Sequence, residues 1–163
     1  MKLTGLLVGA AGLTGAYFGI RALVLKRLND EIQVISSVNI NKLTLTSLEL
    51  RIDLLIKNPT SGTVTVKYPF VKIYYDGAML GSSEVKDKDF PIPKYSQMPV
   101  DPIYLPIPLP SLISLAPKML DDLQKGNPIA LQVTAVTTLN NTVPYTRTDT
   151  ITIKQGSNAG KKS

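Results

Sequence analysis

The chain has 163 residues with no Cys, His or Trp, and its formal charge is +6 from 18 basic and 12 acidic residues. This length suits about one domain. The missing residue types exclude thiolate nucleophiles, disulfides, imidazole general bases and zinc sites built from thiolates or imidazoles. A site of carboxylates alone remains open in principle, but we expect no enzyme, no cofactor and no metal.

The excess positive charge lies at the two ends of the chain. Residues 1–27 hold four basic residues and no acidic one, and residues 154–163 hold three lysines. The remaining 126 residues hold 11 basic and 12 acidic residues and are therefore nearly neutral. This distribution is typical of a membrane anchor and not of a phosphate-binding face, so we expect no nucleic-acid partner.

Residues 3–20 form an uncharged run, and apolar character resumes after Arg21. A helix over residues 3–25 would be about 34 Å long, enough for a hydrocarbon core of about 30 Å. We predict that residues 1–27 are a single-pass transmembrane anchor, with Arg21, Lys26 and Arg27 at the interface, and residues 28–33 a linker. A cleaved signal peptide and a buried soluble helix are the alternatives. Against a signal peptide, only Lys2 precedes the apolar run, and the run is long. Against a buried soluble helix, the helix would be apolar on every side.

Small residues recur within this segment at a 4-3-4-3 spacing, which places Gly5, Gly9, Gly12, Ala16 and Gly19 on one face of a helix. Such a stripe lets membrane helices approach closely, although glycine is also common in membrane helices generally. The positive-inside rule would place the following domain in the cytoplasm, by a margin of two charges. The bilayer could be that of a cell or of a virion.

From residue 34 onward, apolar and polar residues alternate, which predicts β-strands with one buried face. Leu48, Leu50, Ile52, Leu54 and Ile56 show this most clearly, and the turn residues Asn58 and Pro59 follow them. The Asp76–Gly77 pair predicts a tight hairpin. The expected strands are residues 34–45, as one strand or two, and then 48–57, 63–68, 70–75, 78–81, 130–139 and 146–153.

Seven of the 12 prolines lie between Phe90 and Pro110. Here Ile103, Leu105, Ile107 and Leu109 alternate with proline or tyrosine. Because successive N–H groups of a strand point to opposite sides, prolines at every second position remove donors from one side only. We therefore predict an edge strand with an apolar face, not a disordered linker.

A short amphipathic helix is expected over residues 114–125, with Leu112, Leu115, Met119, Leu120 and Leu123 on one face and a stop at Gly126. Six to eight strands and one helix predict a β-sandwich over residues 34–154. Residues 155–163 are expected to be a flexible basic tail.

Three carboxylates, Glu84, Asp87 and Asp89, lie close together in a loop with interleaved lysines. The ligand spacing and the central glycine of a calcium-binding loop are absent. We interpret the segment as a solvated charged loop.

Residues 34–153 resemble the late embryogenesis abundant type 2 family, also called the water-stress and hypersensitive-response (WHy) domain. The matching elements occur in order: IKNPT at residues 56–60, YDGAMLG at 75–81, FPIP at 90–93 leading to Ser96, a strand and helix ending at Gly126, and two final strands. The resemblance implies an immunoglobulin- or fibronectin-like sandwich with one helix and no catalytic residues. We interpret Asn58 and Pro59 as a structural turn and not as a ligand site.

These features together predict a non-catalytic structural or interaction protein that a single helix anchors to a membrane. Its expected partners are the lipid bilayer and either another protein or a second copy of itself. A specific version is a minor structural protein of a membrane-containing virion. The alternative, by family analogy, is a stress-protective domain or one that binds lipids or other hydrophobic ligands. No small-molecule substrate is otherwise expected.

Overall fold

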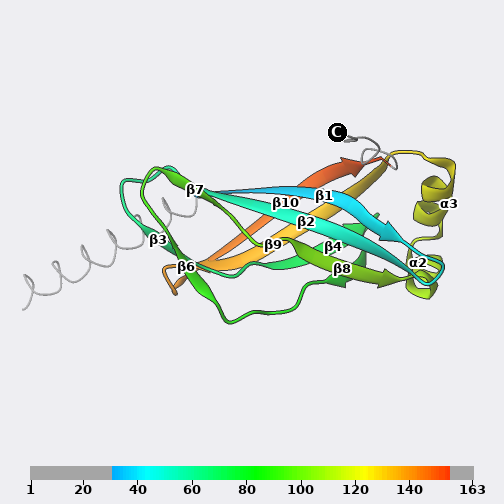
Figure 1. Cartoon of the computed structure of the whole chain (residues 1–163), viewed down its shortest axis with the longest axis horizontal. Coiled ribbons are helices and arrows are strands. Elements are labelled where there is room, and N and C mark those ends of the chain that lie inside the picture. Colours follow the sequence, from blue (N-terminus) through cyan, green and yellow to red (C-terminus); the bar gives the residue numbers. More distant parts are fainter. Residues whose placement is uncertain (1–30, 155–163) are drawn as a thin grey trace, which may run out of the picture.

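Alternating apolar and polar residues fold the part of the chain that the structure describes, residues 31–154, into strands and two short helices. The structure is a computed structural model and is shown in Figure 1. In chain order the elements are β1 (Gln33–Leu43), β2 (Ser47–Asn58), β3 (Val64–Lys67), β4 (Phe70–Tyr75), β5 (Ala78–Ser82), β6 (Asp89–Ile92), β7 (Ser96–Pro99), β8 (Ile103–Pro108), α2 (Leu109–Leu115), α3 (Pro117–Lys125), β9 (Ile129–Leu139) and β10 (Val143–Ile153).

The strands form two sheets, and all the pairs are antiparallel. In the first sheet β2 is central: β1 pairs with one edge of it, while β7 and β8 share the other edge. In the second sheet β9 is central: β10 pairs with one edge, and β3 and β4 share the other. Strands β6 and β5 extend that side by pairing with β3 and β4 respectively.

The core lies between the two sheets. The inward residues of β2 are Leu48, Leu50, Ile52, Leu54 and Ile56, and each is at most 2% exposed. They form one continuous buried cluster with Ile73 of β4 and with Leu131 and Val133 of β9. The one-sided burial predicted for this strand is confirmed, and so is the mainly β, two-sheet architecture.

The proline-rich segment forms β8, as predicted. Its residues Ile103, Leu105 and Ile107 are buried, whereas Tyr104, Pro106 and Pro108 are exposed. The strand pairs with β2 alone, and Leu50 stands opposite Leu105. Because a proline has no N–H group, the N–H groups that β8 donates to β2 belong to the residues between the prolines.

One part of this prediction is wrong, because Leu109 begins α2 instead of continuing the strand. Its N–H group still donates to the carbonyl oxygen of Thr46, at 2.9 Å.

The single helix predicted over residues 114–125 is also a wrong prediction, because two helices are present. They separate at Ala116, whose φ and ψ of −146° and 58° are not helical. The residue before a proline is disfavoured in the helical region, and Pro117 follows here. The break buries Ala116 with Met119 and Leu123 and leaves Leu115 about half exposed.

The number of strands exceeds the expected six to eight, because β6 and β7 were not predicted. These short strands carry Pro91 and Pro99, and sequence patterns favour turns there. The expected linker also ends earlier than residue 33, since Gln33 already belongs to β1 and Ile32 is buried. The Tyr145 hydroxyl donates to the Ile32 carbonyl oxygen at 3.2 Å and attaches this first segment to β10.

The sandwich has two distinct ends (Figure 1). Strand β1 starts at Gln33 at the end that we call proximal, and it finishes at Leu43 at the end that we call distal, where α2 and α3 lie. Eleven strand residues at about 3.3 Å each separate the two ends by roughly 36 Å. The proximal end is thus the one that the segment before residue 31 joins.

The predicted anchor lies outside the described residues, with its stripe of Gly5, Gly9, Gly12, Ala16 and Gly19 and its interfacial Arg21, Lys26 and Arg27. The same holds for the tail over residues 155–163. Within residues 31–154, neither helix has the length and apolar character needed to span a bilayer. The anchor therefore remains a prediction from sequence.

Candidate interaction surface

Asn58 ends β2 with a buried side chain that is 1% exposed. Its amide nitrogen donates to the carbonyl oxygens of Gly62 at 2.8 Å, Ile92 at 3.0 Å and Pro93 at 3.1 Å. Its amide oxygen accepts from the backbone N–H of Thr60 at 3.1 Å and from the Thr60 hydroxyl at 2.7 Å. One side chain thus joins the turn after β2 to the turn after β6, and Pro59 lies exposed beside it. This is the geometry of a structural turn.

The Asp76–Gly77 pair joins β4 to β5. Both residues have positive φ, 47° and 81°, as a type I′ hairpin turn requires. No atom would lie within 4 Å of a Cβ added at Gly77, so its backbone conformation, not crowding, is what favours glycine there.

Several charged groups of the described domain pair with one another at the surface. Ion pairs join Arg51 to Asp53 at 2.9 Å, Lys125 to Asp121 at 2.7 Å, and Arg147 to Asp149 at 2.9 Å. In each pair, the hydrogen bond to the carboxylate raises the pKa of the cation above its ordinary value. These groups stay protonated at neutral pH, and none of them is prepared for proton transfer.

The loop that contains Glu84, Asp87 and Asp89 is tied to the sandwich by charge and backbone. The Lys67 ammonium lies 3.0 Å from the Asp87 carboxylate, and this hydrogen bond raises the pKa of Lys67. The N–H of Tyr68 donates to the Lys88 carbonyl oxygen at 2.7 Å. Between residues 31 and 154 no three Asp or Glu side chains gather closely enough to hold a metal ion.

A surface hollow of about 420 Å³ lies between the edges of β5 and β8. Its lining includes Tyr68, Ile103 and Leu105 as well as the charged residues Glu84 and Lys86. The Lys86 ammonium sits 4.7 Å from the centre of the Tyr68 ring, in cation–π contact. The hollow is therefore lined by both apolar and charged side chains.

The distal end exposes several large apolar side chains. Leu45, in the turn between β1 and β2, is 97% exposed. The hydrogen bond from Leu109 to Thr46 brings α2 against this turn, and α2 contributes two more exposed apolar residues. We call this set the distal patch: Leu43, Leu45, Ile113 and Leu115. Sequence analysis missed it, although the apolar Leu45 between two threonines at a hairpin turn was a usable signal.

The sequence matches no protein-family profile and no curated protein. Several solved structures share the fold. The solution structure of an Arabidopsis thaliana protein aligns with a TM-score of 0.50 at 16% identity, over 72% of this chain and 77% of that one. The X-ray structure of a structural-genomics target gives a TM-score of 0.50 at 9% identity, over 77% and 87% of the two chains.

A third solved structure is a solution structure of a candidate late embryogenesis abundant protein. It aligns over 83% of this chain and 86% of that chain, at 13% identity and a TM-score of 0.45. At such identities, the two alignments with a TM-score of 0.50 show a shared fold and nothing about activity.

Proposed function

We propose that this chain is a non-catalytic interaction protein, held at a membrane by residues 1–27, whose β-sandwich presents its distal end to a protein partner. The sandwich would be of the late embryogenesis abundant type 2 kind. The bilayer is the first partner in this proposal, and a protein that binds at the distal patch is the second.

This proposal rests on the position of the distal patch. Large apolar side chains that are exposed together at one end of a domain are candidates for contact with a partner. This patch lies at the end of the sandwich opposite the residue where the predicted anchor joins the domain. An anchored domain would therefore hold Leu45 roughly 36 Å from its attachment point, where a partner can reach it.

The first prediction concerns the anchor. Alkaline carbonate washing should leave the full-length protein in the membrane fraction, because a spanning helix is released only when the bilayer dissolves. A variant without residues 1–27 should be soluble and should retain the far-ultraviolet circular dichroism of a folded β domain. Release of the full chain by carbonate, or a mature N-terminus near residue 20, would contradict the anchor.

The second prediction concerns the distal patch. A photo-crosslinking residue at position 43 should form one discrete adduct in the native membrane, and Leu45→Asp should abolish it. Val85→Asp is the matched control, because Val85 is also apolar and highly exposed but lies in the charged loop. An adduct at twice the 17.7 kDa mass would identify a second copy as the partner. Equal adducts in both variants would show that the patch is not the contact.

A second candidate function is binding of a hydrophobic ligand, and the hollow between β5 and β8 favours it. Its volume of about 420 Å³ lies within the usual range of small-ligand sites. The charged lining residues Glu84 and Lys86 suit an amphipathic molecule better than a fully apolar one. We rank this function second, because the hollow is open along one side of the sandwich instead of enclosed between the sheets.

A role in a membrane-containing virion is the more specific version of the first proposal. It predicts that genes for capsid and packaging proteins neighbour the gene for this chain. A neighbourhood of cellular envelope genes would argue for a cell membrane instead.

A further inference from the structure

The connection between the predicted anchor and the domain is short. Ile32 is buried and its carbonyl oxygen accepts the Tyr145 hydroxyl, so the domain already begins at this residue. Only residues 28–31 separate it from Arg27, the last residue of the predicted anchor. Even fully extended, the step from Arg27 to Ile32 spans at most about 18 Å. The proximal end must therefore stay close to any bilayer that holds the anchor.

The outer face of the first sheet carries an apolar row at this end. Ile35 of β1 stands opposite Leu55 of β2, and Leu55 stands opposite Pro99 of β7. Ile35 and Pro99 are exposed, and Leu55 is half-buried. All three point away from the core, because the residues next to Ile35 and Leu55 in the sequence, Val34 and Ile56, are buried. An aliphatic strip thus crosses three strands on the solvent side.

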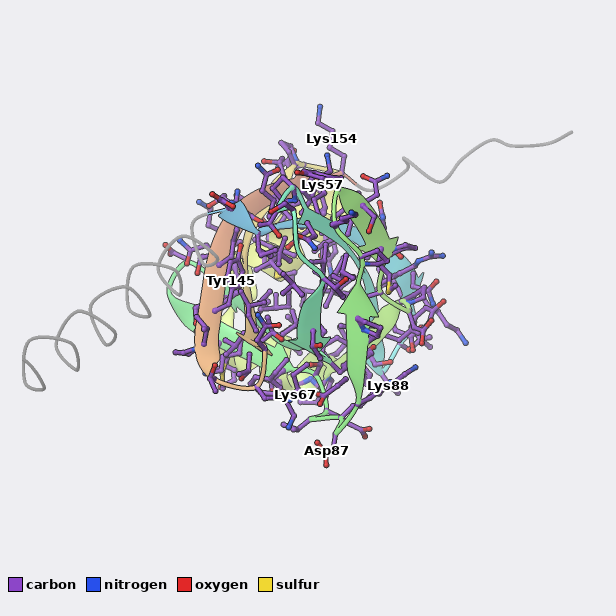
Figure 2. All side chains as sticks on the ribbon, turned by 90° about the vertical axis from the view of Figure 1, so that its left-hand side faces the viewer. Lys57, Lys67, Asp87, Lys88, Tyr145 and Lys154 are labelled. Carbon is purple, nitrogen blue, oxygen red and sulfur yellow. The ribbon has the colours of Figure 1, made fainter. Side chains whose placement is uncertain are left out.

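Basic and aromatic side chains continue this strip toward the very end of the sandwich. In the next row Lys57 stands opposite Gln33 and Gln97. Beyond it, Lys94 and Tyr95 occupy the turn between β6 and β7, and Tyr95 is 70% exposed. Figure 2 looks onto this end, with Lys57 on one side of it and Lys67, Asp87 and Lys88 on the other.

Tyr95 is held in place although its side chain is exposed. Its backbone N–H donates to the Thr60 carbonyl oxygen at 3.1 Å, and its φ is 52°. Tyr95 and Lys57 border the same surface hollow. We call the whole set the proximal patch: Ile35, Leu55, Lys57, Lys94, Tyr95 and Pro99.

The composition of the proximal patch matches the headgroup layer of a bilayer. Tyrosine and lysine combine an apolar body with a polar end, and they favour the boundary between lipid and water. Lysines near a membrane surface are attracted by anionic lipids. None of the six patch residues is a carboxylate: Asp53, one row farther along, is paired with Arg51, and the exposed Glu31 comes two residues before Gln33.

We propose that the proximal patch rests on the headgroups of anionic lipids in the membrane that holds the anchor. This inference rests on the proposed function, since the anchor brings the patch to the bilayer. Tethering raises the effective concentration of lipid at the patch, so a weak affinity of the patch for lipid suffices. The domain then contacts the bilayer through the β1–β2–β7 face. Its distal patch faces outward in a restricted range of orientations.

The absence of Trp from the sequence allows a direct test with the full chain. A Tyr95→Trp variant carries a single indole in the proximal patch, and a Leu45→Trp variant carries one at the distal end. Each variant is reconstituted into vesicles of phosphatidylcholine with phosphatidylglycerol, with and without a nitroxide quencher at headgroup depth. Because the quencher is present in both leaflets, the orientation of the protein in the vesicle does not affect the result.

The Tyr95→Trp variant should show a blue-shifted emission that the shallow quencher suppresses, whereas the Leu45→Trp variant should show neither effect. Adding Lys57→Glu and Lys94→Glu to the Tyr95→Trp variant should remove the shift and the quenching. Lys118→Glu with Lys125→Glu, on α3 at the distal end, is the matched control and should leave both unchanged.

Flotation of the vesicles separates this inference from the proposed function. If the chain floats with lipid but both indoles are equally unquenched, the proximal patch does not touch the membrane and the inference is wrong. If the chain does not float at all, the anchor itself is wrong, and the inference is overturned with it. If quenching persists with both lysines replaced, the attraction to anionic headgroups is refuted.

Discussion

Leu105→Asp is expected to unfold the domain, whereas Tyr104→Asp should leave it folded. The Leu105 side chain is 4% exposed and packs against β5, where a Cβ at Gly81 would lie 3.4 Å from it. An unpaired carboxylate there should cost several kcal/mol, comparable with a typical domain stability of about 5–15 kcal/mol. Tyr104 is 50% exposed on the opposite face, so its replacement should cost about 1 kcal/mol or less.

Urea denaturation followed by circular dichroism measures both substitutions. Hydrogen exchange in the unmodified chain provides an independent readout, because the amides of Leu105, Ile107 and Leu109 should exchange slowly. Fast exchange at all three, together with equal tolerance of both substitutions, would mean that residues 103–108 are not a strand of the sandwich.

Asn58→Leu is expected to have the second-largest effect. Leucine has a similar size but leaves the carbonyl oxygens of Gly62, Ile92 and Pro93 and the N–H of Thr60 without this partner. A buried polar group that loses its partner costs about 1–3 kcal/mol, so a total of about 3 kcal/mol or more is expected. Asn127→Ala is the control, because it removes only an exposed hydrogen bond to Asp122.

Asn58→Asp tests the same network with almost no change of shape. The carboxylate would face the carbonyl oxygens that the Asn58 amide now contacts at 3.0 and 3.1 Å, and it would have no hydrogen to donate. Burial beside these oxygens should raise the pKa of the new carboxyl in the folded state. The folded state then binds a proton more tightly than the unfolded state, so stability should increase as the pH falls from 7 toward about 4. Unfolding midpoints that do not depend on pH relative to the wild type would contradict this account of Asn58.

Short-range patterns correctly predicted the strands that alternate strictly. The inward face of β2 and the edge strand β8 both follow from period-two alternation, and the β4–β5 hairpin follows from Asp76–Gly77. The helix break at Ala116 was also encoded locally, in Pro117, which lies inside the single helix expected over residues 114–125. Strands β6 and β7 were missed because four residues with a proline carry too little alternation to separate a strand from a turn.

The sequence by itself determined which side chains of the strictly alternating strands face inward, where the β4–β5 hairpin turns and that the excess charge lies at the two ends of the chain. These features depend on neighbours a few residues apart. Only the tertiary structure decided which strands share an edge, as β7 and β8 share β2. It also decided that Asn58 bonds to residues 34 and 35 positions away, and that the proximal and distal patches form at opposite ends. These features arise from pairings between distant segments, and no local spacing records which segments will meet.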